Sequence, residues 1–169
     1  AAAGEFKDRA AAECVTADLA AATGDIHGRP AALRLTATNS GPAARGAWAK
    51  FERKFAPPLD LSGQQVLGVW VHGDGQGEVV NFQLKSPDHL STALGEHYVM
   101  IDFTGWRYVE LIEPEGKRFA AYTWPYGDEY SIYRESIEYK QTASVGIWIN
   151  NVPPGKTATV HFGPVKALP

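Results

Sequence analysis

Cysteine is nearly absent from this sequence, and long apolar runs are missing altogether. The single Cys14 excludes an internal disulfide, a zinc-binding CxxC pair and a dithiol redox centre. No stretch approaches the ~20 apolar residues that a membrane-spanning helix needs, and the start shows no basic region followed by an apolar one, as a signal peptide would. We therefore expect no membrane partner.

Charge of one sign is also lacking. The chain has 16 basic and 19 acidic residues, a formal net charge of -3, and no block of like charges. Proteins that bind nucleic acid or an anionic membrane carry a basic patch that neutralises phosphates, and the whole-chain balance gives no sign of one. Nucleic acid is accordingly not an expected partner.

Short segments rich in β-branched and aromatic residues recur from residue 31 onward, between clusters of Gly, Pro, Asn and Asp. This spacing is typical of antiparallel sandwiches and barrels, and no long amphipathic segment flanks the strands as a parallel α/β fold requires. The expected strands are 31–38, 47–55, 65–72, 78–85, 97–104, 106–113, 136–139, 145–150 and 157–162.

The N-terminal segment 8–24 is rich in alanine, which favours a helix, but Cys14-Val15-Thr16 interrupts it with weaker helix formers. We favour an edge strand over a helix there. No repeat of fixed period and no Pro- or Gly-rich linker divides the chain. The sequence therefore predicts one domain over residues 1–169.

The glycine-rich run HGDGQGE, residues 72–78, could suggest a phosphate-binding loop. Such a loop needs a helix after its glycines, and the Walker pattern needs Lys followed by Ser or Thr, whereas Glu78-Val79 opens another strand. We therefore expect a hairpin between two antiparallel strands, with glycines at positive φ angles and Asp74 capping the turn.

Three stretches, LGVWVHGDGQGEVVNFQLKS, YVMIDFTGWRYVELIEP and YSIYRESIEYKQTASVGIWINNVPPGKTATVHFGPVKAL, carry a family resemblance. They are similar to the galactose-binding-domain-like jelly rolls that serve as carbohydrate-binding modules in bacterial polysaccharide-degrading enzymes. The resemblance covers about residues 45–168, and its most particular pieces are Gly73-Asp74-Gly75 and DFTGWR at 102–107. It implies an antiparallel β-sandwich with a concave face, non-catalytic sugar binding and a secreted parent protein.

Strand alternation divides the predicted strands into an apolar face and a second face. The apolar face is expected to form the core and contains Val69, Val71, Val80, Phe82, Leu84, Val99, Ile101, Phe103, Ile147 and Ile149. A sugar ring offers an apolar CH face and hydroxyl groups, so its site pairs flat aromatic rings with amides, acids and guanidinium groups. The second face has that mixture, in Trp70, His72, Asn81, Gln83, Tyr98, Met100, Asp102, Trp148 and Asn150.

Each candidate ligand residue also has a structural explanation. Trp70 and Trp148 could belong to the core, and His72 could lie at the shoulder of the glycine hairpin. Asp102 could fasten the turn that precedes Trp106, itself expected to be structural, and Arg107 could pair with an internal carboxylate or bind two hydroxyls. In the aromatic loop 122–133, Trp124 and Tyr126 could clamp a ligand or fold back over the sheet.

An enzyme is the main alternative to a binding module. A glycosidase needs two carboxyl groups about 5 to 10 Å apart, and Asp102 is the only acid expected on the second face. A jelly-roll polysaccharide lyase would use Tyr or His as a base, and His72, Gln83, Tyr98 and Arg107 could share a face. No G-x-S-x-G nucleophile elbow occurs, and the five histidines show no close pair at metal-ligand spacing.

The resemblance also raises the question of a structural calcium ion, because jelly rolls of that group often hold one. Gly163-Pro164 stands in the last strand where an acidic pair is expected, which argues against the site. Glu5, Asp8 and Glu13 could still supply the hard oxygen ligands that calcium prefers. We expect no other cofactor.

These observations together predict a β-sandwich that binds a polysaccharide or oligosaccharide without transforming it. The resemblance implies that it is an appendage of a larger, secreted, glycan-degrading enzyme. A lyase, and a structural spacer or protein-interaction module, are the two alternatives. The sequence does not identify the sugar.

Overall fold

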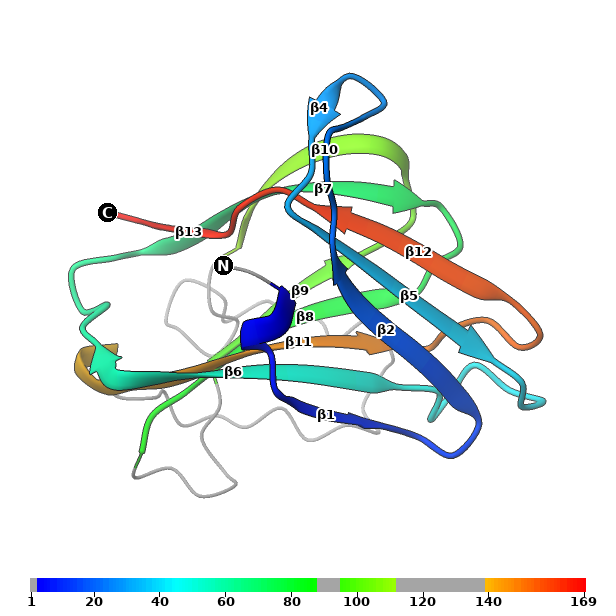
Figure 1. Cartoon of the computed structure of the whole chain (residues 1–169), viewed down its shortest axis with the longest axis horizontal. Helices are drawn as coiled ribbons and strands as arrows, with labels where there is room; N and C mark the ends of the chain where they lie inside the picture. Colours follow the sequence, from blue (N-terminus) through cyan, green and yellow to red (C-terminus); the bar gives the residue numbers. More distant parts are fainter. Residues whose placement is uncertain (1–2, 88–94, 112–138) are drawn as a thin grey trace, which may run out of the picture.

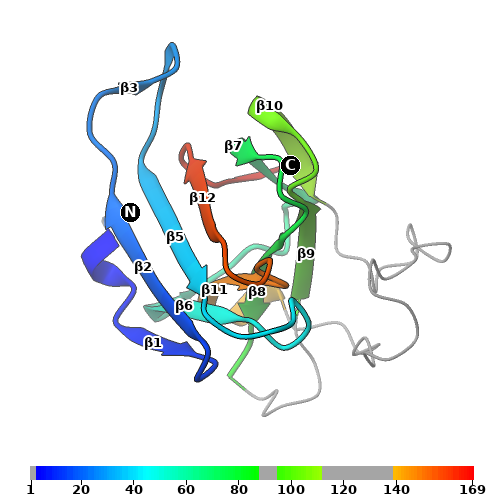
Figure 2. The ribbon, with the colours of Figure 1, turned by 90° about the vertical axis from the view of Figure 1, so that its right-hand side faces the viewer.

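A computed structural model describes residues 3–87, 95–111 and 139–169 of the chain. Two antiparallel sheets pack face to face in it, which confirms the predicted all-β antiparallel β-sandwich (Figures 1 and 2). Sheet A contains, in spatial order, β1 (Asp8–Ala11), β6 (Ala49–Leu59), β11 (Thr142–Asn150), β8 (Val79–Lys85) and β9 (Gly95–Met100).

Sheet B contains, in spatial order, β10 (Thr104–Leu111), β7 (Val66–Asp74), β12 (Thr157–Phe162), β5 (Leu33–Asn39) and β2 (Val15–Ala21). The short β13 (Lys166–Leu168) also pairs with β7. A small hairpin, β3 (Asp25–Ile26) and β4 (Arg29–Pro30), projects from the ends of β2 and β5 (Figures 1 and 2). The described helical segments are the 3₁₀ turns η1 (Ala3–Glu5) and η3 (Tyr139–Gln141), and neither could cross a membrane.

The core lies between the two sheets, where the apolar faces of their strands meet. Every residue that alternation assigned to the apolar face is buried. Phe82 of β8 and Phe162 of β12 meet across the two layers as an edge-to-face pair, with ring centroids 5.5 Å apart. Such aromatic pairs add about 0.5–1.5 kcal/mol beyond the apolar area they bury. These contacts hold the sheets in register and leave one outer face on each.

The N-terminal segment forms strands, as predicted, but two of them instead of one. β1 lies at the edge of sheet A beside β6, and β2 lies at the edge of sheet B beside β5. The chain passes from one sheet to the other at Ala12–Cys14, where Val15 N donates a hydrogen bond to Ala12 O. The interruption at Cys14 that argued against a helix thus coincides with a change of sheet.

The prediction that HGDGQGE forms a hairpin is wrong. β7 belongs to sheet B and β8 to sheet A, so the glycine run is a crossover between the two sheets. Its local chemistry is as expected: Gly75 and Gly77 have φ angles of 74° and 89°, and Asp74 accepts a hydrogen bond from Gln76 N. Sequence alternation on both sides suits a crossover as well as a hairpin, because either strand has one buried face.

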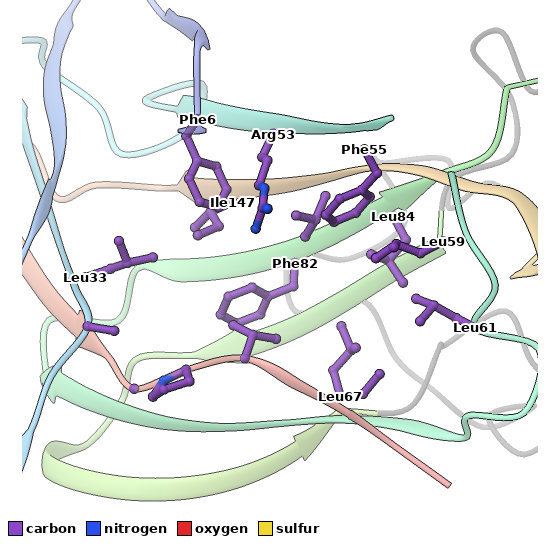
Figure 3. A pocket seen from close by; sticks show the side chains of 16 residues that line it. Phe6, Leu33, Arg53, Phe55, Leu59, Leu61, Leu67, Phe82, Leu84 and Ile147 are labelled. Atoms are coloured by element: carbon purple, nitrogen blue, oxygen red, sulfur yellow. The ribbon is translucent and has the colours of Figure 1, made fainter. Parts of the chain in front are cut away.

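An apolar cavity of about 240 Å³ remains between the sheets (Figure 3). Sheet A contributes Phe82, Leu84 and Ile147 to its wall, and sheet B contributes Leu33 and Leu67. The one charged side chain at the wall is Arg53, which forms an ion pair with Glu5 at 3.2 Å. The sandwich is therefore incompletely filled at this place.

Candidate functional site

The outer face of sheet A carries a row of four side chains at one level of four neighbouring strands. Lys50 of β6 is the cross-strand partner of Trp148 of β11, which is the partner of Asn81 of β8, which in turn is the partner of Tyr98 of β9. Directly opposed residues project from the same face of a sheet, so the row is continuous. It brings together Asn81, Tyr98 and Trp148 as the sequence predicted.

At the next level of the same face, one of the four positions is a glycine and has no side chain. Glu52, Gly146, Gln83 and Glu96 occupy the same four strands in the same order. A Cβ atom at Gly146 would lie 3.3 Å from Nε1 of Trp148, so the glycine leaves room for the indole. Trp148 Nε1 donates a hydrogen bond to Gln83 Oε1 at 3.2 Å. The ring is thereby fixed along the sheet.

A polar network fixes the amides of β8. Glu96 Oε1 accepts hydrogen bonds from Gln83 Nε2 at 3.0 Å and from Asn81 Nδ2 at 3.4 Å, and Asn81 Oδ1 accepts one from the His97 backbone. Burial raises the pKa of Glu96, and the two amides partly offset this by stabilising the charged form. Side chains held in this way need little reordering when a ligand arrives.

Further aromatic and charged groups border the network. The rings of Trp48 and Trp148 lie 5.4 Å apart at an angle of 40°, and Lys50 Nζ lies 5.5 Å from the Trp148 ring centroid. Lys85 Nζ donates to Glu52 Oε2 at 2.9 Å. The face therefore offers the partly exposed indole of Trp148 and phenol of Tyr98 together with paired charges. The Asn81 and Gln83 amides are only 3% and 4% exposed, so they support this surface from beneath.

Sequence analysis missed several members of this face. Glu96 was missed because the expected strand began one residue too late, at 97. Lys50 and Glu52 alternate with the buried Ala49 and Phe51, so the same parity rule applied to segment 47–55 would have found them. Gly146 had no sequence signal, because its role is to be small beside Trp148.

The predicted second face proves to be two faces on opposite sides of the molecule. Asn81, Gln83, Tyr98, Met100, Trp148 and Asn150 belong to sheet A, whereas Trp70 and His72 belong to sheet B. Parity shows only that a side chain points away from the core. It does not reveal to which sheet the strand belongs, so the prediction merged the two outer faces.

Asp102 and Arg107 also lie apart from the row on sheet A. Asp102 precedes β10, is exposed, and lies 3.8 Å from the guanidinium group of Arg107, which covers the ring of Phe103 at 4.1 Å. Trp106 Nε1 donates to Ile26 O at 2.7 Å, in keeping with its predicted structural role. Trp124 and Tyr126 lie outside the described residues.

The calcium hypothesis finds no support at the N-terminal acids. Glu5 pairs with Arg53, and Asp8 lies 3.3 Å from Lys54 Nζ, so both carboxylates face cations. In the part of the chain that the structure describes, no group of three or more His, Cys, Asp or Glu side chains could hold a metal ion. Glu5 and Asp8, each paired with a cation, therefore do not fit a calcium site.

Comparison with known proteins gives structural neighbours only: no family model and no curated protein matches the chain. A carbohydrate-binding module of the β-sandwich superfamily, studied for its promiscuous specificity, aligns with a TM-score of 0.58 at 10% identity. That alignment covers 96% of this chain and 56% of the other. The family 11 carbohydrate-binding module from Clostridium thermocellum, bound to a β-1,3-1,4-mixed-linked tetrasaccharide, aligns with a TM-score of 0.58 at 12% identity, over 95% and 87%.

An exo-β-agarase is a third neighbour, with a TM-score of 0.52 at 13% identity. The alignment covers 96% of this chain but 23% of that enzyme, so the present fold corresponds to a small part of it. Identities this low establish architecture and leave function to be argued from the site. The chain has the β-sandwich fold of these carbohydrate-binding modules.

Proposed function

We propose that this protein is a non-catalytic carbohydrate-binding module that holds a polysaccharide or oligosaccharide on the outer face of sheet A. The observation that carries the proposal is the continuous row Lys50, Trp148, Asn81, Tyr98, with the Trp148 indole laid over Gly146 and tied to Gln83. The fold of the structural neighbours supports it.

The row suits a sugar chain because it alternates stacking surfaces with polar groups. An indole or phenol ring stacks on the CH face of a pyranose, while an ammonium group such as that of Lys50 bonds to its hydroxyls. The buried amides of Asn81 and Gln83 hold neighbouring side chains in place. A hydrated sugar exchanges bonds to water for bonds to protein, so the net gain per contact is small. We expect affinities in the micromolar to millimolar range, about -4 to -8 kcal/mol.

The structure supports a lyase less well than the sequence alone did. That alternative required His72, Gln83, Tyr98 and Arg107 on one face, and the structure separates His72 and Arg107, on sheet B, from Gln83 and Tyr98, on sheet A. On the sheet A face, Glu52 is paired with Lys85, and Glu96 accepts bonds from two amides. These carboxyl groups are occupied in structural bonds, which favours binding without turnover.

We also propose that residues 1–169 act as one module within a larger secreted enzyme that degrades glycans. The alignment to an exo-β-agarase, over 96% of this chain and 23% of that protein, is consistent with such an arrangement. The secreted location is part of the same proposal, since polysaccharides are substrates outside the cell. The binding experiment applies to residues 1–169 alone, whatever larger protein contains them.

A glycan array followed by calorimetry tests the binding site. Trp148→Ala and Tyr98→Ala should each weaken the binding of the best neutral glycan by about 1–3 kcal/mol, because each removes a stacking surface. Tyr108→Ala is the matched control: Tyr108 is an aromatic residue of sheet B that is 42% exposed, on the opposite face. It should leave the affinity unchanged.

Two outcomes would contradict the proposal. An array without any hit would favour the spacer or protein-interaction alternative. An increase in absorbance from an unsaturated product during the titration, lost in Tyr98→Phe, would show that the face is the active site of a lyase.

A further inference from the structure

The outer face of sheet B is partly covered by the β3–β4 hairpin. Its two-residue turn consists of His27 and Gly28, whose φ angles are 48° and 84°. A non-glycine residue rarely adopts a positive φ, and such strain persists only where other contacts hold it. Trp106 of β10 supplies one of them, because its Nε1 donates to Ile26 O at 2.7 Å. The hairpin is thus fastened to the sheet with His27 at its tip.

Histidine and arginine side chains gather beneath this tip. His27 stacks on His72 of β7 with ring centroids 4.9 Å apart, and His72 meets His161 of β12 edge-on at 5.7 Å. Arg34 of β5 is the cross-strand partner of His161. We call these four residues the basic cluster. Beside it, the Arg29 guanidinium lies 3.5 Å from the centroid of the Trp70 ring.

No described carboxylate forms an ion pair with a member of the basic cluster. Within the described residues, neither Arg29 nor Arg34 forms an ion pair. Asp18, on the neighbouring β2, pairs with Arg9 instead. Asp74, on the same strand as His72, accepts hydrogen bonds from Thr159 N and from Gln76. The remaining acid of the hairpin, Asp25, is exposed and forms no ion pair with a described residue.

Burial and neighbouring basic groups both disfavour the charged form of a histidine, so they lower its pKa. Burial, and next the neighbouring His27, lower the pKa of His72. Burial, and next His72, Arg34 and His27, lower the pKa of His161. The surroundings therefore disfavour the charged forms of His72 and His161, and an anion placed among these groups would favour them again. His161 Nδ1 is buried and has no hydrogen-bond partner among the described residues.

We propose that the basic cluster is a second binding site, for a sulfate ester or carboxylate carried by a sugar chain. The sugar part of this ligand rests on the proposed function, whereas the anionic part rests on the cluster alone. Imidazolium and guanidinium groups would donate charge-assisted hydrogen bonds to the anion. The net charge of -3 does not oppose this, because the field at a surface depends on local groups.

Binding at this site should strengthen as the pH falls. Besides its own members, the groups that face the cluster are Arg29 and Asp25 of the hairpin, Asp74 of β7, Tyr108 of β10 and Asp18 of β2. His72 and His161, whose pKa values lie below the ordinary histidine value because of burial, gain charge as the pH falls. An anion favours their charged form, so the affinity should rise severalfold from pH 8 to pH 5.5.

Calorimetry with three probes tests the proposal: a sulfated galactan oligosaccharide, the same oligosaccharide after desulfation, and an oligogalacturonate. Arg34→Gln should weaken binding of the sulfated or the carboxylated probe at least fivefold at pH 5.5 and reduce its dependence on salt. The control is Lys166→Gln, an exposed residue of β13 that removes an equal charge from the same sheet. It should have no effect. His161→Gln should weaken binding similarly, and the exposed Arg34 keeps the test decisive if that variant does not fold.

The inference is wrong if Arg34→Gln and Lys166→Gln have equal effects, or if neither anionic probe binds better than the desulfated one. Trp148→Ala separates this result from the proposed function. Suppose that Trp148→Ala weakens binding of the desulfated probe while Arg34→Gln leaves binding of the anionic probes unchanged. The sheet A site is then supported and the basic cluster is not a binding site. Suppose instead that Arg34→Gln weakens binding of the anionic probes, Trp148→Ala does not, and the desulfated probe does not bind. The basic cluster is then supported and the sheet A site is not.

Discussion

Glu78 is a carboxyl group whose surroundings keep it protonated. It is fully buried at the end of the glycine crossover, and neither oxygen has a described hydrogen-bond donor. Burial, and next the neighbouring Asp74 carboxyl, raise the pKa of Glu78 to about 9. Burial also raises the pKa of Asp74, but hydrogen bonds from Glu78, Thr159 and Gln76 outweigh it, so the net effect is a lowered pKa. The neighbouring Asp74 thus adds to burial in favouring the protonated form of Glu78.

This pair should make stability depend on pH in an unusual direction. Glu78 ionises near 4.5 in the unfolded chain and near 9 in the folded one, so its contribution is complete below pH 4.5 and is lost as the pH rises toward 9. Glu78→Gln cannot ionise and keeps a donor for Asp74. The variant should exceed the wild type in free energy of unfolding at pH 8 by on the order of 2 kcal/mol, and by less at pH 5.

Urea denaturation at pH 5, 6.5 and 8 measures this difference. Glu13→Gln is the control, since Glu13 is exposed, and it should show no such trend. A Glu78→Gln variant that is less stable than the wild type at pH 8 would mean that Glu78 is charged in the folded protein.

At the scale of elements, the glycine crossover shows what alternation can and cannot predict. The predicted segments matched β5–β12 to within a few residues, because a strand with one buried face has apolar residues at every second position. The segment 136–139 lies almost entirely outside the described residues. The sheet to which each strand belongs was not predictable, since Val71 and Val80 look alike in sequence yet face the core from opposite layers.

The same limit applies to the candidate site. Asn81 and Tyr98 were placed together correctly, because both are polar-face positions of strands that happen to be neighbours. Trp70 has the same parity but lies under Arg29 on the other sheet. Contacts of that kind, between an N-terminal hairpin and a strand some 40 residues later in the printed sequence, leave no periodic signal.

The crossover should matter for folding and not for binding. Gly75 has a φ of 74°, and a Cβ there would lie 2.9 Å from Thr104 Cγ2, so Gly75→Val should lower the free energy of unfolding by about 1–3 kcal/mol. Gly63→Val is the control, because the space around that residue is open. The folded fraction of Gly75→Val should bind the best neutral glycan as the wild type does. Normal stability with lost binding would place the crossover in the site.

At the scale of the whole molecule, the sandwich presents two outer faces of different chemistry on one shared core. Sheet A carries the half-buried Trp148 with buried amides and paired charges, and sheet B carries the basic cluster, with which no described carboxylate forms an ion pair. Because the same core supports both faces, a change in packing should affect the stability of the entire fold while leaving the chemistry of each face intact. The cavity between the sheets allows this to be examined.

Filling that cavity should stabilise the fold. Ala167 of β13 lines it and is the cross-strand partner of Leu67, another lining residue, so a larger side chain at 167 would extend into the same space of about 240 Å³. Each added carbon buried is worth about 0.8 kcal/mol, against about 0.5–1 kcal/mol of lost leucine rotamer freedom. Because leucine adds three carbons, Ala167→Leu should raise the free energy of unfolding by about 1.5–2 kcal/mol and Tm by about 3–8 °C. Thermal unfolding of Ala10→Leu, at an exposed position of β1, is the matched comparison. Equal shifts in the two variants, or a lower Tm for Ala167→Leu, would show that the space cannot accept a side chain.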